Sequence, residues 1–148
     1  MTTTQLSLDE QERSLFMLIK KEMCIENPRE IAQQVTAVLH ALRQTLSLSV
    51  ACDLLNRLPD FLKMIFASNW RHDEARVTIN HLDEFVNLVM ERDRKLKKHL
   101  FKSEEHTLSI AILTLKKMHH LVDFGEIRDI SASLRQELSE VDSEGVLA

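Results

Sequence analysis

Residues 31–66 have the sequence IAQQVTAVLHALRQTLSLSVACDLLNRLPDFLKMIF, and their apolar positions decide the fold. They align without a gap with residues 107–142, TLSIAILTLKKMHHLVDFGEIRDISASLRQELSEVD, so that apolar side chains fall on apolar side chains. Four of the 36 pairs are identical: Leu39/Leu115, Asp53/Asp129, Leu58/Leu134 and Leu62/Leu138. Two helices and the break between them rarely agree at one offset by chance. The pattern predicts two related multi-helix repeats, 76 residues apart (107 minus 31).

The intervals between apolar residues predict an all-α protein, a compact helical bundle of about seven helices. Apolar residues recur every three or four positions almost throughout the chain. With only 2 Gly and 2 Pro, the sequence has few of the turn residues that β-hairpins need. Helix starts are marked by capping residues or proline. The expected starts are Ser7 with Glu10, Asn27 with Pro28, Ser47 or Ser49, Pro59, Asn80 with Asp83, Ser103, and Asp123 with Glu126.

The periodicity also predicts how the chain is divided. Residues 1–141 form a single all-α domain, with a first half at about 7–68, a connector at about 69–79 and a second half at about 80–141. The connector is expected there because the segment SNWRHDEAR interrupts the apolar pattern. The last residues, 142–148, carry no periodicity and are expected to form a flexible tail.

Composition limits the classes of function. With 44% hydrophobic and 28% charged residues, the 148-residue chain is typical of a soluble protein with one core. A net charge of −4 argues against nucleic acid as a partner, because phosphate binding needs a strong positive field. Cys24 and Cys52 lie singly in apolar helical stretches, which predicts buried, reduced thiols. We expect a cytoplasmic protein, because the sequence has neither a secretory leader nor a long apolar run.

No motif predicts catalysis, a cofactor or a metal. Asp123-Phe124-Gly125 matches the metal-binding tripeptide of protein kinases, but the chain has no glycine-rich loop or other kinase motif. The 7 histidines include no H-x-x-x-H or H-E-x-x-H pair, and adjacent His119 and His120 point about 100° apart on a helix. No strand-to-helix turn is available to present a nucleophile. We therefore expect no enzyme activity.

Two clusters are candidates for a partner or ligand surface. The first is the basic run near the end of an expected helix, which comprises Arg92, Arg94, Lys95, Lys97 and Lys98. Cations at a helix C-terminus often do no more than complement its dipole, but such a run also suits an anionic partner. The second cluster is Trp70, Arg71 and His72 in the connector. A lone tryptophan at this position commonly closes the edge of a core, and a ligand pocket is the alternative.

Residues 38–70, VLHALRQTLSLSVACDLLNRLPDFLKMIFASNW, resemble a bacterial family known as a conserved domain of unknown function. The resemblance rests on Val38-Leu39, Leu42, Leu46, Ala51, Leu54, Leu58-Pro59, Leu62, Phe66 and Trp70. It covers roughly residues 10–141 and implies two helical units, but no catalytic residues. The chain departs from the family at two positions. Asn69 replaces the usual Gly before the Trp, and Asn also tolerates a left-handed backbone. Arg135 stands where a second Leu-Pro is expected.

Taken together, these patterns predict a non-catalytic protein that binds an unknown protein partner or associates with itself. One alternative is a small-ligand or anion-binding module in a groove between the halves, with the connector cluster on one side and the basic run on the other. Peripheral membrane association through the basic run is the third option, although its apolar flank is short for an interfacial helix.

Overall fold

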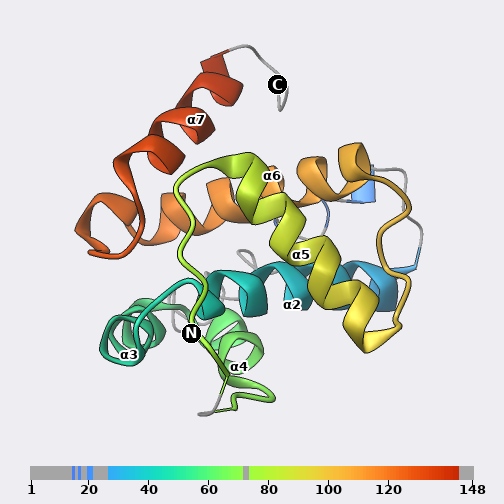
Figure 1. The fold of residues 1–148 in the computed structure, drawn as a ribbon, viewed down its shortest axis with the longest axis horizontal. Coiled ribbons are helices and arrows are strands. Elements are labelled where there is room, and N and C mark those ends of the chain that lie inside the picture. Colours follow the sequence, from blue (N-terminus) through green and yellow to red (C-terminus); the bar gives the residue numbers. More distant parts are fainter. Residues whose placement is uncertain (1–14, 16, 18–19, 22–26, 72–73, 144–148) are drawn as a thin grey trace, which may run out of the picture.

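The computed structural model describes residues 15, 17, 20–21, 27–71 and 74–143, and within these ranges it is helical without strands (Figure 1). The elements are α2 (Pro28–Gln44), α3 (Leu48–Arg57), α4 (Asp60–Ala67), α5 (Leu82–Leu96), α6 (Glu104–Leu121), the 3-10 helix η1 (Phe124–Glu126) and α7 (Ala132–Ser143). The all-α class is confirmed. The expected first helix at Ser7 begins outside the described residues, but Leu15, which lies within its expected length, is fully buried.

Helix α2 passes through the middle of the molecule, with α5 and α6 on one side and α4 on the other (Figure 1). It begins as predicted, because the Asn27 side chain accepts a hydrogen bond of 2.9 Å from the Arg29 amide and Pro28 occupies the first turn. The apolar residues at helical spacing along it are all buried: Ile31, Val35, Val38, Leu39, Leu42 and the following Leu46.

Helix α6 begins 76 residues after α2 (104 minus 28), as the alignment requires. Ser103 caps it by accepting a 3.0 Å hydrogen bond from the His106 amide. Residues 110–115 are all buried, so α6 is enclosed on more sides than a single apolar stripe requires. Its neighbours are α2 and α5.

Helices α3 and α4 follow the predicted breaks. Ser47 precedes α3, which ends before Pro59, and α4 follows this proline. The expectation of a buried Cys52 is wrong, since its thiol is exposed. The buried face of α3 is formed by Val50, Ala51 and Leu54, and Cys52 points away from it.

The second half differs from the first after α6, and the predicted helix starting at Asp123 is wrong. The Asp123 carboxylate accepts a hydrogen bond of 2.8 Å from the Gly125 amide, but the turn that it caps is only three residues long. Phe124 and Ile127 are buried in the core, which fixes this segment as a turn. Helix α7 starts only at Ala132, where the Ser131 hydroxyl accepts a 3.0 Å hydrogen bond from the Leu134 amide.

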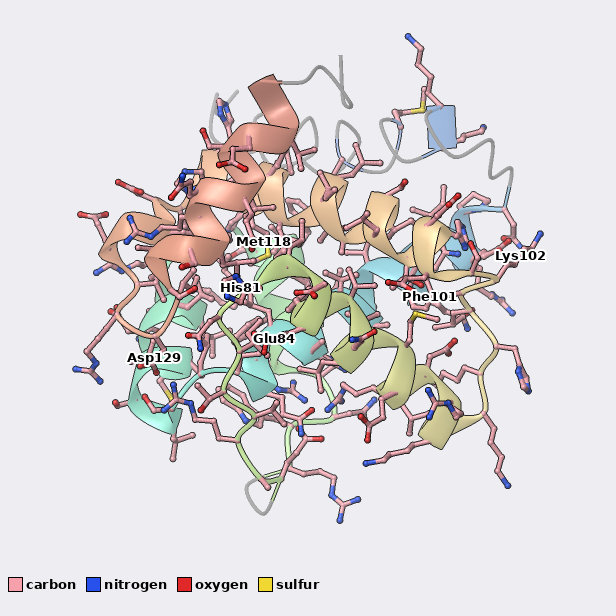
Figure 2. All side chains as sticks on the ribbon, turned by 45° about the horizontal axis from the view of Figure 1, so that its top comes forward. His81, Glu84, Phe101, Lys102, Met118 and Asp129 are labelled. Atoms are coloured by element: carbon pink, nitrogen blue, oxygen red, sulfur yellow. The ribbon has the colours of Figure 1, made fainter. Side chains whose placement is uncertain are left out.

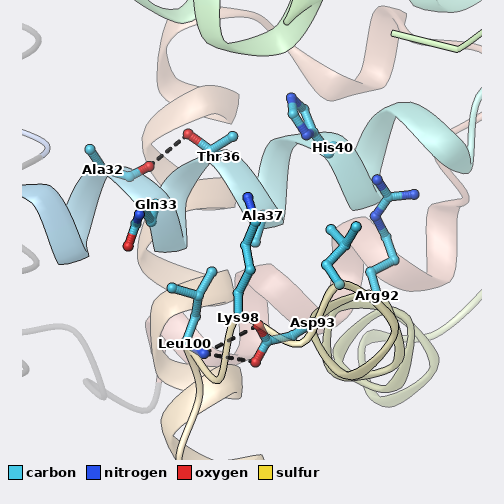
Figure 3. A pocket seen from close by; sticks show the side chains of 10 residues that line it. Ala32, Gln33, Thr36, Ala37, His40, Arg92, Asp93, Lys98 and Leu100 are labelled. Atoms are coloured by element: carbon cyan, nitrogen blue, oxygen red, sulfur yellow. Dashed lines mark hydrogen bonds between the residues drawn. The ribbon is translucent and has the colours of Figure 1, made fainter. Parts of the chain in front are cut away.

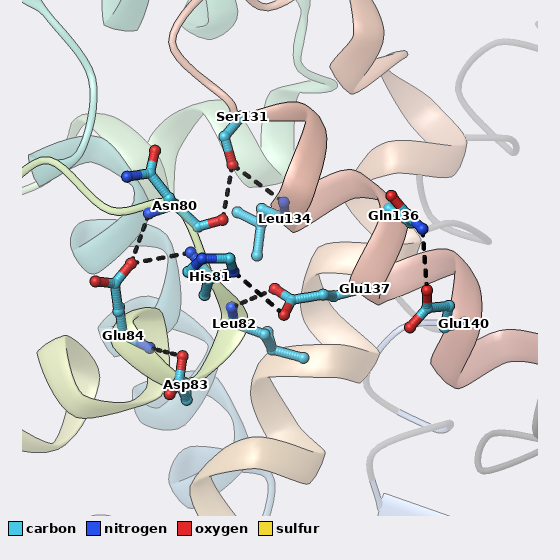
Figure 4. Close-up of polar contacts among 10 residues, drawn as sticks. All are labelled: Asn80, His81, Leu82, Asp83, Glu84, Ser131, Leu134, Gln136, Glu137 and Glu140. Carbon is cyan, nitrogen blue, oxygen red and sulfur yellow. Dashed lines mark hydrogen bonds and ion pairs between the residues drawn. The ribbon is translucent and has the colours of Figure 1, made fainter.

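Helix α5 starts later than predicted from Asn80 and Asp83. The Glu84 carboxylate accepts hydrogen bonds from the amides of Asn80 (2.7 Å) and His81 (3.0 Å), so His81 becomes the N-cap (Figure 4). These two hydrogen bonds lower the pKa of Glu84. Helix α7 docks at the same place, because Glu137 accepts a 2.8 Å hydrogen bond from the Leu82 amide.

The connector is not helical in its described parts, as predicted, and it lies along the end of α2. The Val77 amide donates to the Gln44 carbonyl at 3.0 Å, and Arg76 Nε donates to the Thr45 carbonyl at 3.0 Å. None of the helices in the described ranges combines the length and apolar character needed to cross a membrane.

Candidate functional site

In the part of the chain that the structure describes, no group of three or more His, Cys, Asp or Glu residues could hold a metal ion. His119 Nδ1 accepts a hydrogen bond of 3.0 Å from the Phe124 amide, and His120 is exposed. The polar groups that the fold does gather occur at the end of α4, along the groove between α2 and α5, and between α6 and α7.

The carboxyl end of α4 is held by two polar side chains of α2. His40 Nε2 lies 3.0 Å from the Ile65 carbonyl oxygen. Arg43 Nη1 donates to the carbonyl oxygens of Phe66 (2.6 Å) and Ser68 (2.9 Å), and Nη2 donates to that of Asn69 at 3.3 Å. The Phe66 carbonyl lies in the last turn of α4, where no further helical amide can donate to it, and the Ser68 and Asn69 carbonyls lie just beyond the helix. The Ile65 carbonyl also accepts hydrogen bonds from the Ser68 amide (3.2 Å) and hydroxyl (2.7 Å). A positive charge is also favourable there because of the helix dipole.

Trp70 belongs to this capping arrangement. Its ring meets Phe66 edge-on, with 5.9 Å between centroids, and the Arg43 guanidinium lies 5.2 Å from the centre of the indole. Asn69, before it, has a φ of 51°, the left-handed conformation that the expected glycine would also adopt. Trp70 thus closes an edge of the core. Together with Arg71 it lines a cavity of about 120 Å³, and His72 lies outside the described residues.

The basic run does not form one continuous surface. Arg92 is largely buried. Its Nη1 donates hydrogen bonds to Glu74 Oε2 and to Gln44 Oε1, each at 2.6 Å. Lys95 pairs with Glu91 on the same helix at 3.2 Å. The remaining cations, Arg94, Lys97 and Lys98, are exposed. Among the described residues they have no ionic partner, and Lys97 ends α5 with a left-handed φ of 56°.

The chain after α5 is fixed by a buried aspartate. Asp93 accepts hydrogen bonds from the amides of Leu100 (2.9 Å) and Phe101 (3.2 Å). Gln34 of α2 donates to the Leu100 carbonyl at 2.9 Å. This loop, with Phe101 and Lys102, lies on the opposite side of the molecule from Asp129 (Figure 2). Its fixed path defines one wall of the groove between α2 and α5.

That groove contains a cavity of about 150 Å³ (Figure 3). Its floor is mainly apolar, and Ala32, Ala37 and Leu100 contribute to it. Lys98 reaches from the loop toward α2 and, with Arg92, supplies positive charge at the edge (Figure 3). Asp93 is the acidic residue among the described lining residues, and its oxygens already accept the loop amides. Leu96, also at the edge, is 58% exposed.

The two predicted clusters line different cavities. The cavity at Trp70 and Arg71 shares no described lining residue with the cavity at Arg92 and Lys98. A third cavity, of about 360 Å³, is lined by parts of both the connector and α5. Its charges largely satisfy one another, since Arg92 pairs with Glu74 and Lys95 with Glu91. The groove between α2 and α5 is therefore the better candidate for binding an external charged group.

Sequence reasoning missed three polar residues that organise the fold: His40, Arg43 and Asp129. The first two lie three residues apart beside the apolar stripe of α2, and a helix packed on several sides must bury such neighbours. The Asp129 carboxylate accepts a 2.8 Å hydrogen bond from the Ser47 amide and so joins the second half to the start of α3. Nothing in its local sequence distinguishes it from Asp53.

Replacement of Asp129 by alanine is expected to lower the free energy of unfolding by about 1–2 kcal/mol, as the loss of a helix cap does. The pKa of Asp129 is lowered overall. Burial raises it, but the hydrogen bonds from Ser47 and the positive charges of Arg76 and Arg128 lower it by more. This contribution is therefore lost as the pH falls through the depressed pKa. Urea unfolding followed by circular dichroism measures the change.

Asp53→Ala is the matched control, because Asp53 occupies the aligned position and pairs only with Arg57 at the surface, at 3.4 Å. An exposed i,i+4 pair on a helix, such as this one, contributes about 0.3–0.5 kcal/mol. Equal losses for Asp53→Ala and Asp129→Ala would show that the hydrogen bond to the Ser47 amide does not stabilise the junction.

Comparison with known proteins finds one family. A family model described as "Uncharacterized conserved protein (DUF2267)" matches residues 18–141. The expected resemblance to a domain of unknown function is confirmed at that level, over slightly less of the chain than predicted. No curated protein matches the sequence.

Proposed function

The chain belongs to the uncharacterised conserved family DUF2267, and we propose that it acts as a non-catalytic protein-interaction module. Its partner in this proposal is an acidic segment of another protein that carries an apolar anchor. The observation that supports it is the groove between α2 and α5, where an apolar floor lies beside unpaired positive charge. No family property contributes to this proposal beyond membership itself.

The charges around the groove favour an acidic partner. Lys98 lines it without an ionic partner among the described residues, and Arg92 beside it is paired with Glu74. The carboxylate of Asp93 is oriented toward the amides of the loop, whose hydrogen bonds offset part of its negative charge. Electrostatic complementarity of this kind mainly accelerates association and selects among partners. It accounts for the part of the basic run that the fold does not use internally.

The apolar part of the groove supplies the anchor site. Leu96 remains 58% exposed beside Ala37 and Leu100, so an aliphatic or aromatic side chain placed there would remove apolar surface from water. Buried anchors of this kind typically carry most of the binding free energy of an interface. The small volume, about 150 Å³, fits one side chain.

The test uses a short synthetic amphipathic peptide that combines leucines with glutamates, and a twin with lysines in place of glutamates. We expect the acidic peptide to shift the backbone amide resonances of Ala32, Ala37 and Leu100 in a saturable way, and the basic twin to shift none of them. Leu96→Asp and Lys98→Glu should each weaken binding about tenfold, since each removes an attraction and adds a repulsion.

Leu48→Asp is the matched control, because Leu48 has the same 58% exposure on a different helix. It should bind the acidic peptide like the parent protein. Shifts that map to another surface, or equal binding of both peptides, would refute the proposal. Co-sedimentation with anionic vesicles but no peptide binding would favour the membrane alternative, and dimers disrupted by Leu96→Asp would indicate self-association.

Three finer parts of the description remain predictions within this proposal. The two-repeat architecture is supported by the matched starts of α2 and α6, but η1 replaces the counterpart of α3. The bacterial source, which the family resemblance implies, and the cytoplasmic location are the other two predictions. The surface formed by Trp70 and Arg71 is a second location for a ligand, and quenching of Trp70 fluorescence would reveal it.

A further inference from the structure

A cavity of about 250 Å³ lies between the last turns of α6, η1 and α7. The described residues that line it are Lys116, His119, Phe124, Arg135, Leu138 and Ser139. Lys116 and His119 are one turn apart on α6, and the three residues from α7 share one face of that helix. Regular secondary structure on both sides thus holds the polar groups of this cavity in place.

The described lining of the cavity is cationic, and the Asp123 carboxylate is the nearby counter-charge, 3.9 Å from His119 Nδ1. Two of its described lining residues, Lys116 and Arg135, are cationic, and none of these lining residues is acidic. His119 Nδ1 accepts the Phe124 amide at 3.0 Å, so in the neutral ring the proton must be on Nε2, which is then a donor. The cavity therefore offers donors and positive charge, which suit an anion.

Arg135 is the residue that most clearly points to a ligand. Its Nε is buried and has no hydrogen-bond partner among the described atoms. Its guanidinium lies close to Gly125, where a Cβ atom would stand only 3.3 Å from Nη1 and 3.1 Å from Asp123 Oδ1. No carboxylate of the described chain forms an ion pair with this arginine, although Asp123 stands nearby. A guanidinium without an ionic partner suits a carboxylate or phosphate group.

The apolar lining limits what such an anion can be. Phe124 and Leu138 are almost fully buried, and their exposed edges form an apolar wall beside the cations. The volume lies below the roughly 300–1,000 Å³ of typical ligand sites, so the ligand must be small. We infer that this cavity binds a small organic anion, with its carboxylate or phosphate between Lys116 and Arg135 and its apolar body against Phe124. This site is independent of the groove proposed for the protein partner.

The test uses benzoate and phenyl phosphate as probes, at constant ionic strength, with benzyl alcohol as the neutral control. The readout is the Gly125 amide resonance, which is readily assigned because the chain has only 2 glycines. We expect a saturable shift with at least one of the anions and none with benzyl alcohol. The stronger of the two anions identifies the charged group that the site prefers.

Arg135→Gln and Lys116→Gln should each weaken anion binding roughly tenfold or more, as removal of a charge-assisted hydrogen bond does. Arg94→Gln is the matched control, because it removes the same charge from an exposed position on α5. Circular dichroism checks the fold of each variant, and Lys116→Gln decides the matter if Arg135→Gln does not fold. Absence of any anion-dependent shift, or binding to both cavity variants that equals binding to Arg94→Gln, overturns the inference.

Discussion

Replacing Arg43 by methionine is expected to lower the free energy of unfolding by about 3 kcal/mol, since hydrogen bonds from a charged donor contribute about 1.5–3 kcal/mol each. Methionine keeps most of the apolar stem but leaves the carbonyls of Phe66 and Ser68 without their donor. Arg43 is only 3% exposed, so water cannot easily replace it. For a chain of this length the loss corresponds to about 10 °C in melting temperature. Thermal and urea unfolding followed by circular dichroism measure both quantities.

Two further substitutions separate the guanidinium from the size of the side chain. Arg43→Lys should lose roughly half as much stability, because a single ammonium group cannot reach all three carbonyls as the planar guanidinium does. Arg94→Met, at an exposed position, should stay within about 0.5 kcal/mol of the parent protein. If Arg43→Met were as stable as Arg94→Met, the cap on α4 would not be a major contribution to the fold.

The helices of the first half could be predicted because their signals are local. Asn27 with Pro28 marks the start of α2, and Pro59 separates α3 from α4. Such signals act within one turn of the chain, so a sequence pattern captures them. The start of α5 was less predictable, because it depends on more distant contacts. Glu84 accepts hydrogen bonds from two amides at once, and Glu137 of α7 accepts a hydrogen bond from the Leu82 amide.

The second half shows where a sequence pattern fails. The alignment pairs Leu48 with Phe124, but Leu48 is 58% exposed and Phe124 only 1%. Burial of Phe124 draws the chain inward and limits η1 to three residues, although Asp123 does form the predicted cap. A capping residue shows where a helix can begin, but tertiary packing decides how far it continues. The number of helical turns after Asp123 was therefore not predictable from its capping residues.

The candidate sites were predicted only in part, because charge alone does not reveal pairing. The run from Arg92 to Lys98 is continuous in sequence, but the structure uses Arg92 and Asp93 internally and leaves Lys98 at the groove. At the offset of 76, positions 40 and 43 correspond to Lys116 and His119 (40 plus 76 and 43 plus 76). The first two cap α4, whereas the second two line the cavity near Arg135. Aligned positions thus serve different purposes in the two halves.

The protonation of His40 is expected to lower the free energy of unfolding by about 3 kcal/mol between pH 7 and pH 4. Its pKa is lowered from 6.5 to about 4, mainly because the ring is buried and to a lesser extent because of the positive charge of Arg43. The contact with the Ile65 carbonyl oxygen requires the proton on Nε2, because that oxygen can only accept. Between pH 6.5 and 4 the unfolded chain therefore binds a proton that the folded protein does not. Stability is complete above the unfolded pKa and falls as the pH approaches the folded one.

His40→Gln tests this account, because its side-chain amide can still donate to the Ile65 carbonyl but does not titrate. Urea unfolding monitored by Trp70 fluorescence at pH 7 and pH 4 should show a loss about 3 kcal/mol smaller in this variant than in the parent protein. Other acidic groups titrate in both proteins, so the difference between the two isolates His40. His120→Gln, at an exposed position of α6, should retain the loss of the parent protein. Equal acid sensitivity of the two variants would mean that His40 is protonated in the folded state without cost, and that Arg43 alone holds the end of α4.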